Sequence, residues 1–185
     1  MEVAAEDPPH NSPETPLISQ AATTGLVPPV GSLIFQTNVT SLDRAKIRYL
    51  LGLEAKIILV QEHRLRGKKL FDCIKKLKTR FFVICNAAMR TEKGGTSGGV
   101  MILVQKHMTL LPSLYTIDKT SSFWVHAIIR LKNFNFSVFC IYLHPENEAL
   151  NMKTLFDVEA AIDKTLCPYF IGGGTIIETQ SNLVH

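Results

Sequence analysis

The sequence contains no long hydrophobic run and no secretory leader. No stretch approaches the roughly 18 consecutive apolar residues of a membrane-spanning helix. The first twenty residues have neither Lys nor Arg and no apolar core. These absences predict an intracellular protein, cytoplasmic or nuclear, that is not secreted and has no membrane partner. They leave its oligomeric state open.

Cysteine is scarce as well. The four cysteines, Cys73, Cys85, Cys140 and Cys167, are widely spaced and form no CxxC pair. Three of them lie in apolar-patterned segments. This pattern is typical of buried, reduced thiols rather than of a zinc site or a disulfide framework.

The run from Gly94 to Gly99, GGTSGG, contains no nucleotide-binding motif. It does not match GxGxxG, and a P-loop would need Lys and then Ser or Thr where Val100 and Met101 stand. We expect these glycines to allow close backbone packing at the start of a strand.

Charge is divided unevenly along the chain. Residues 1–30 contain four acids, no Lys or Arg, and six of the nine prolines, which is typical of a disordered acidic tail. Because the whole chain carries +4, residues 31–185 carry +8. A basic domain favours anionic partners, nucleic acid among them. We expect this domain to span residues 32–173 and a divergent C-terminal tail to span 174–185.

Hydrophobic periodicity predicts alternating strands and helices. Seven apolar, β-prone runs predict strands near residues 32–38, 56–61, 80–85, 99–104, 123–131, 135–143 and 168–172. Three helices are predicted near 42–52, 67–78 and 149–165, with Phe71 on the apolar face of the second and Leu155 on that of the third. Thr40 or Ser41 is expected to cap the first of them. The mixture predicts a layered α/β fold rather than a parallel, doubly wound sheet.

Eight Lys and Arg residues fall between Arg64 and Arg80. Two interpretations fit this segment. It forms a surface that binds the phosphate backbone of nucleic acid, or it is the ordinary solvated face of the predicted helix.

Polar side chains stand at the ends of three predicted strands. Asn38 ends the first strand, Glu62 follows the apolar run Ile57–Val60, and Tyr142 and His144 come at the end of a later one. A carboxylate at a strand end can bind a hard cation such as Mg²⁺ through oxygen. Glu62 can equally be a solvated strand end that is paired with Arg64 or Arg66.

Five stretches of the sequence resemble one known family, the endonuclease/exonuclease/phosphatase superfamily. This family includes abasic-site endonucleases, deoxyribonuclease of the pancreatic type and the endonuclease domains of non-LTR retrotransposons. The stretches occur in the family's order: FQTNVTSL at 35–42, IILVQEHRL at 57–65, GGTSGGVMILV at 94–104, FSVFCIYLHP at 136–145 and YFIGG at 169–173.

The resemblance implies an α/β (α+β) fold, a two-sheet β-sandwich flanked by helices in four layers, α/β/β/α. It also implies cleavage of phosphodiesters or phosphomonoesters with Mg²⁺ or Mn²⁺. Glu62 matches the metal-binding carboxylate of the family, and Asn38 matches the residue beside it that orients metal or phosphate. Tyr142 matches a Tyr near the scissile phosphate, whereas His144 matches the phosphate-contacting His of other branches. One inserted residue separates these two registers, and the sequence does not choose between them.

The sequence also departs from the family after Gly173. The family has Asp, an aromatic residue and Asn there, where this chain has Gly174, Thr175 and Ile176. No counterpart of the family's C-terminal Asp-His pair precedes His185. The resemblance therefore predicts a truncated nucleic-acid endonuclease domain that is inactive or strongly impaired and binds metal weakly. The alternatives are a non-catalytic remnant that binds nucleic acid or protein, and a fragment without function.

Overall fold

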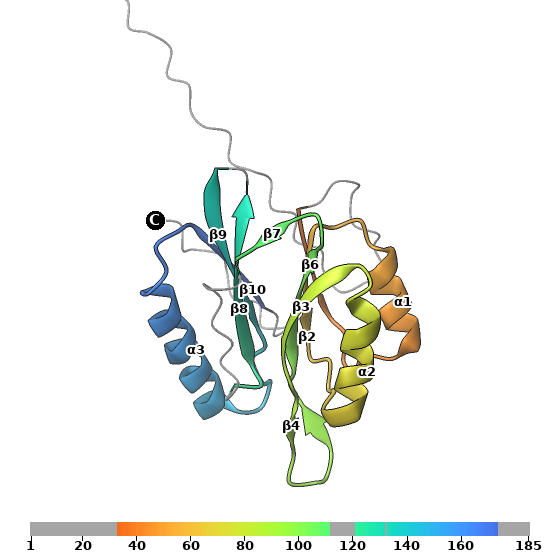
Figure 1. The fold of residues 1–185 in the computed structure, drawn as a ribbon. Coiled ribbons are helices and arrows are strands. Elements are labelled where there is room, and N and C mark those ends of the chain that lie inside the picture. The colour runs from red at the N-terminus through yellow and green to blue at the C-terminus, as the bar shows by residue number, and fades with distance from the viewer. Residues whose placement is uncertain (1–32, 112–120, 132, 174–185) are drawn as a thin grey trace, which may run out of the picture.

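The computed structural model describes residues 33–111, 121–131 and 133–173. Within them, two four-stranded sheets lie face to face, with helices on their outer faces (Figure 1). Two helices cover the first sheet and one covers the second. The four-layer α/β/β/α arrangement expected from the sequence is thus confirmed. The predicted tails over 1–30 and 174–185 lie outside the described residues.

The elements follow the predicted order closely. The helices are α1 (Arg44–Gly52), α2 (Gly67–Leu77) and α3 (Glu148–Ile162). The long strands are β1 (Ile34–Asn38), β2 (Ile57–Gln61), β3 (Phe81–Asn86), β6 (Val100–Gln105), β8 (Trp124–Leu131), β9 (Phe134–Ile141) and β10 (Tyr169–Gly173). Three two-residue strands were not predicted: β4 (Met89–Arg90), β5 (Thr96–Ser97) and β7 (Thr109–Leu110).

The first sheet has the strand order β1-β2-β6-β3. Strands β1 and β2 are parallel, so both end at the same edge of the sheet, whereas β6 runs antiparallel to β2 and β3. Every residue of β2 and β6 is buried. Their continuous apolar runs reflect this, because a strand covered on both faces has no polar face to alternate with.

The second sheet has the strand order β10-β9-β8-β7, with β10 parallel to β9. Its edge strand β10 packs tightly onto the first sheet at Gly172. A Cβ atom there would lie 2.1 Å from a methyl carbon of Leu59 and 2.9 Å from Oε1 of Gln36. Only glycine allows this approach without a shift of the neighbouring side chains, which explains the Gly-Gly ending of β10.

Apolar side chains form three layers between these elements. The central one lies between the sheets, with Ile57, Leu59, Val125 and Val138 fully buried in it. The outer two lie under α1 with α2 and under α3. The helix faces are narrower than predicted. Phe71 of α2 and Leu155 of α3 are exposed, and Cys73 and Thr154 are buried in these two helices.

The start of α1 differs from the prediction. Asp43, and not Thr40 or Ser41, is the N-cap, and its carboxylate accepts a hydrogen bond of 2.9 Å from the backbone N–H of Lys46. This bond is the largest cause of the lowered pKa of Asp43. Thr40 and Ser41 have left-handed backbones, with φ of 40° and 91°, which is not the extended conformation of an N-cap residue.

Candidate functional site

The ends of β2 and β9 meet across the interface between the two sheets. Nε2 of Gln61 lies 3.8 Å from Sγ of Cys140, and this thiol lies 3.6 Å from the carbonyl oxygen of Val60. Because β1 is parallel to β2, its end lies at the same edge. The residues that follow these strands, or close them, are therefore brought together, and they include Asn38, Glu62 and Tyr142.

Glu62 is buried, although it follows the last residue of its strand, and its residue is only 6% exposed. Oε1 accepts hydrogen bonds from Nε of Arg64, at 2.9 Å, and from Nη2 of the same guanidinium group. Oε2 accepts a hydrogen bond of 3.4 Å from the hydroxyl of Thr40. The carboxylate is thus held by a cation on one oxygen and a hydroxyl on the other. It pairs with Arg64, as one reading of the sequence proposed, yet it is not solvated.

Asn38 is linked to Glu62 through Thr40. The Oδ1 atom of Asn38 accepts hydrogen bonds from the backbone N–H of Thr40, at 3.0 Å, and from its hydroxyl, at 3.3 Å. The same hydroxyl lies 3.4 Å from Oε2 of Glu62. Since it carries one proton, the two oxygens share it as acceptors, and Thr40 lies between the residues that end β1 and follow β2. Thr40 is a site residue that sequence reasoning missed, although it lies within the NVT stretch beside Asn38.

Tyr142 places a neutral hydroxyl against Glu62. Its residue is 4% exposed, and its ring stacks on Phe123 with the centroids 6.2 Å apart. Burial and the negative charge of Glu62 raise the pKa of Tyr142 to about 12, and the nearby positive charge of Arg64 acts in the opposite direction. The phenol therefore keeps its proton and donates a hydrogen bond to the Glu62 carboxylate.

His144 lies in the loop before α3 instead. Its Nδ1 accepts a hydrogen bond of 3.2 Å from the backbone N–H of Glu146. Its own backbone is bonded in both directions to the side chain of Asn151, at 2.6 and 2.8 Å. Of the two residues left open by the sequence, the structure places Tyr142 beside Glu62 and ties His144 to the helix.

Backbone strain is concentrated in the two loops that follow β1 and β2. Four non-glycine residues with positive φ, Thr40, Ser41, Glu62 and Arg64, lie just after β1 and β2. Such conformations cost about 1–3 kcal/mol each and persist where the surroundings over-determine them. Here Ser41 donates to the carbonyl oxygen of Glu62 at 2.9 Å, and Arg64 donates to that of Gly98 at 3.1 Å.

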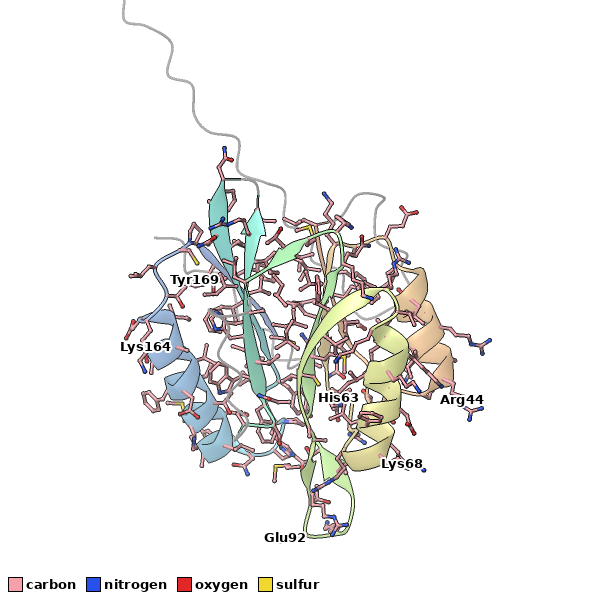
Figure 2. All side chains as sticks on the ribbon, viewed as in Figure 1. Arg44, His63, Lys68, Glu92, Lys164 and Tyr169 are labelled. Carbon is pink, nitrogen blue, oxygen red and sulfur yellow. The ribbon has the colours of Figure 1, made fainter. Side chains whose placement is uncertain are left out.

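The side chain of His63 holds the loop after β2 through two hydrogen bonds to backbone groups. It is fully buried, and it lies toward the end of the sheets from which β4 and β5 project (Figure 2). Its Nδ1 accepts the backbone N–H of Leu65, so Nε2 carries the proton and donates to the carbonyl of Asn86 at 3.0 Å. Burial lowers the pKa of His63 to about 4. The neutral imidazole therefore links the backbone of Leu65, in the loop after β2, to the backbone of Asn86, at the end of β3.

Comparisons with known proteins bear on the fold. No protein-family model matches the sequence, and no curated protein matches it. A β-hairpin deletion mutant of β-toxin from Staphylococcus aureus matches with a TM-score of 0.50 and 14% identity, over 76% of this chain and 65% of the toxin chain. An endonuclease/exonuclease/phosphatase family protein from Leptotrichia buccalis matches with a TM-score of 0.48 and 12% identity, over 76% and 64% of the two chains. This chain has the endonuclease/exonuclease/phosphatase fold.

Nuclease-type proteins are among these neighbours. The endonuclease domain of TRAS1, a telomere-specific non-LTR retrotransposon, matches with a TM-score of 0.46 and 15% identity. The match covers 76% of this chain and 57% of that domain. This chain therefore spans less than two thirds of the length of these neighbours.

The side chains around Glu62 do not fit a divalent metal ion, because both carboxylate oxygens of Glu62 already accept hydrogen bonds. Mg²⁺ is usually held by one or two carboxylates together with water and substrate oxygens. One Glu62 oxygen already accepts two N–H groups of Arg64, and the other accepts Thr40. Within the described residues, no group of three or more His, Cys, Asp or Glu side chains could hold a metal.

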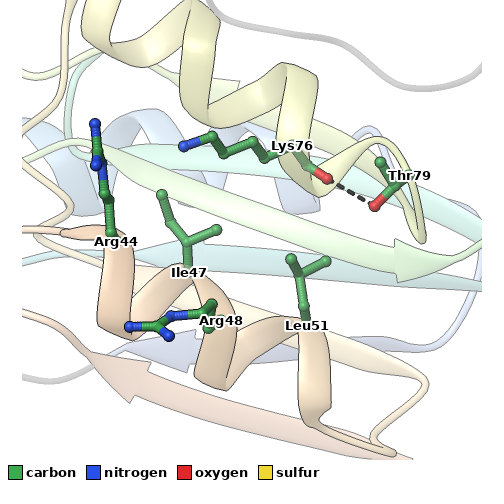
Figure 3. Close-up of a pocket in the computed structure, with 6 residues that line it drawn as sticks. All are labelled: Arg44, Ile47, Arg48, Leu51, Lys76 and Thr79. Carbon is green, nitrogen blue, oxygen red and sulfur yellow. Dashed lines mark hydrogen bonds between the residues drawn. The ribbon is translucent and has the colours of Figure 1, made fainter.

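A second candidate feature is an open pocket between α1 and α2 (Figure 3). Its volume is about 520 Å³. Ile47 and Leu51 supply apolar side chains, and Arg44, Arg48 and Lys76 supply cations. We call this pocket the α1–α2 groove. Its Arg44 end begins directly after the loop that carries Thr40.

The basic segment from Arg64 to Arg80 does not form one continuous face. Arg64 turns to Glu62, and Arg80 donates a hydrogen bond to the carbonyl of Leu51 while its guanidinium lies 5.6 Å from the ring centroid of Phe81. Lys76 lines the α1–α2 groove. The groove also contains Arg44 and Arg48, which lie outside the segment.

Among the residues that the structure describes, no helix is long and apolar enough to cross a bilayer.

Proposed function

We propose that this chain is an endonuclease-type phosphodiesterase domain whose hydrolytic activity is lost or strongly reduced. The observation that supports it best is the joining of Asn38, Glu62 and Tyr142 at the adjoining ends of β1, β2 and β9. Strand ends hold such side chains rigidly at the rim of the core, where ligands can reach them. Two observations support nucleic acid as the substrate: the five matching stretches of sequence, and the cations that line the α1–α2 groove.

The residues at the site are suited to holding a phosphate group. Arg64 has a planar guanidinium that matches phosphate oxygens, and its side chain is 41% exposed. The neutral phenol of Tyr142 donates its one proton to Glu62, and it would become a donor to phosphate by turning from that carboxylate to a phosphate oxygen. Donors of this kind stabilise the charge that builds on a phosphoryl oxygen during hydrolysis.

The group that would activate the attacking water is missing from the sequence. Gly174 stands where the resembled family has Asp, and Ile176 stands where it has Asn. Losing a general base typically slows a reaction by about 10²–10⁴-fold, and losing an electrostatic stabiliser by roughly 10²–10³-fold. Mg²⁺ or Mn²⁺ would be held weakly at best, because Glu62 is engaged with Arg64.

Plasmid nicking in Mg²⁺ buffer tests this proposal. The wild-type chain should nick at or near background, because it lacks the water-activating carboxylate. The double variant Gly174→Asp/Ile176→Asn should nick at least about 10²-fold faster, the gain expected from a restored base. Position 174 directly follows Gly173, which pairs in register with Ile141, the residue before Tyr142.

Two further variants make the nicking assay specific. Glu62→Gln added to the double variant should abolish the gain, because it removes the site carboxylate. Glu54→Gln removes an exposed carboxylate before β2 instead of after it, and should leave the gain intact. Efficient nicking by the wild type would show that activity is not impaired, and no gain in the double variant would argue against the phosphodiesterase assignment.

One observation favours a second candidate function, nucleic-acid binding without cleavage. The α1–α2 groove brings Arg44, Arg48 and Lys76 together from two helices, around an apolar floor. Clustered cations bind phosphate backbones without base contacts, and such binding weakens steeply with salt. A chain that binds DNA in this way and fails to nick in all variants would fit this second function.

A further inference from the structure

Arg64 is built into the site rather than resting on its surface. Its backbone has a φ of 55°, and so does that of Glu62. The backbone N–H of Arg64 donates to Gly98, and its carbonyl oxygen accepts the hydroxyl of Thr96 at 2.9 Å. With the backbone held at both groups, the side chain reaches back two residues and directs two N–H groups at one oxygen of Glu62.

This pairing changes the charge that the site offers to a ligand. Glu62 and Arg64 neutralise each other at the exit of β2. At the exit of β1, Nζ of Lys46 binds the carbonyl oxygens of Val39 and Ser41 at 2.6 and 2.9 Å, and the carboxylate of Asp43 offsets its charge. The site therefore lacks the excess negative charge that a small divalent cation needs to give up its water ligands.

A metal could reach Glu62 only by displacing Arg64. The two N–H bonds to Oε1 are charge-assisted, which makes them among the stronger hydrogen bonds in proteins. The carboxylate is also buried, so water competes little with the guanidinium for it. Arg64 is therefore a strong competitor for the position that a divalent ion would occupy.

We infer that Arg64 is the resident cation of this site, and that with it the site binds the oxygens of a phosphate group without a divalent metal. The inference rests on the proposed function for the location of the site. Two of the five guanidinium N–H groups bind Glu62, and the exposed part of the side chain presents others to an incoming oxyanion.

The inference predicts opposite changes in two affinities when Arg64 is replaced. Inorganic phosphate is titrated into ¹⁵N-labelled protein by NMR, in EDTA and again in Mg²⁺, and Mn²⁺ alone is titrated by electron paramagnetic resonance. The wild type should bind phosphate equally well in both buffers. Arg64→Gln should weaken phosphate binding roughly 10- to 100-fold, the usual loss for a charged hydrogen-bond partner. The same variant should bind Mn²⁺ more tightly than the wild type.

Two control variants separate this role from general charge and from folding. Arg66→Gln removes the same charge two residues away, on an exposed side chain that makes no capping hydrogen bond to α2, and should change neither affinity. Arg64→Lys keeps the charge but not the fork, and should bind phosphate with intermediate affinity. If Arg64→Gln fails to fold, the wild-type titrations with and without Mg²⁺ still decide the point.

Three results would overturn the inference: phosphate binding by the wild type only in Mg²⁺, unchanged Mn²⁺ affinity in folded Arg64→Gln, or equal effects of Arg64→Gln and Arg66→Gln. The proposed function is tested separately, because nicking by Gly174→Asp/Ile176→Asn can succeed even where phosphate binding by the wild type depends on metal.

Discussion

At the scale of single residues, Glu62 shows how the backbone at the end of a strand fixes the direction of a side chain. A left-handed backbone turns the chain sharply after β2, so that Glu62 points its carboxylate back toward Thr40 and Tyr142 instead of into solvent. His63 then fills the space below, and Gly98 and Gly99 pair with the same loop. The strain of the loop is carried by bonds to both neighbouring segments, which is how a site is held in one geometry before a ligand arrives.

Gly99 is the residue on which this arrangement most depends. It has a φ of 85°, and a Cβ there would lie 2.6–3.0 Å from three atoms of the His63 ring. Gly99→Ala should lower the free energy of unfolding by roughly 2–5 kcal/mol, from left-handed strain and overpacking. Urea denaturation measures it.

Gly94→Ala is the matched control for Gly99→Ala. Gly94 also has a positive φ, 79°, but nothing lies within 4 Å of its Cβ position. It should therefore cost only the strain, about 1–2 kcal/mol. Equal losses in the two variants would show that the contact with His63 is unimportant.

At the scale of elements, α1 and α2 serve two purposes with different faces. Their buried residues, Ile47, Leu50, Cys73 and Leu77, pack on the first sheet. The outward groove between them keeps cations and an apolar floor together, as Figure 3 shows for the side chains of Arg44, Arg48 and Lys76. A nucleic-acid strand held there would lie along the helices that directly follow the loops of the site.

The α1–α2 groove can be tested against the rest of the basic surface. The pair Arg48→Ala/Lys76→Ala should weaken binding of a DNA duplex and reduce the slope of log K against log salt by about 2, one unit for each lost phosphate contact. The pair Lys68→Ala/Lys69→Ala removes the same charge from exposed positions of α2 outside the groove. Fluorescence anisotropy at several salt concentrations measures both pairs, and equal slopes would exclude a special role for the groove.

At the scale of the whole molecule, two buried histidines make stability depend on pH. Burial lowers the pKa of His63 and of His126 to about 4, from an ordinary value of 6.5. His126 lies in the second sheet, where its ring stacks on Phe139 and bonds the hydroxyl of Ser137. One histidine in the loop after β2 and one within the second sheet are therefore kept neutral by the fold.

The sign of this dependence follows from proton binding. Between pH 6.5 and 4 the unfolded chain binds protons at these histidines and the folded chain does not, so stability falls as the pH falls. Each histidine should contribute up to about 1.4 kcal/mol per pH unit within that window. Urea midpoints from pH 7.5 to 4.5 measure the slope, and His126→Gln should reduce it by about half. A flat profile in the wild type would contradict the burial of both rings.

Much of the fold could be predicted because its signals are local. The seven long strands and the three helices follow from apolar runs, helical spacing and glycines, since burial on both faces demands a continuous apolar run and burial on one face demands a periodic one. The two-residue strands were missed, because two residues carry no periodicity. The helix faces were drawn too wide, because the sequence does not show where a neighbouring element stops covering Phe71 or Leu155.

The sequence by itself determined which residues stand at the strand ends: Asn38, Glu62 and Tyr142 each come where an apolar run stops. Only the tertiary structure decided what these residues touch. The closeness of β2 to β9 placed Tyr142, and not His144, beside Glu62. The left-handed turns brought two side chains onto the Glu62 carboxylate: Thr40, which is 22 positions away in the sequence, and Arg64, which is two positions away. The reason is physical, because hydrogen bonds and ion pairs depend on distances between atoms, and those are set by how the two sheets pack rather than by the order of residues along the chain.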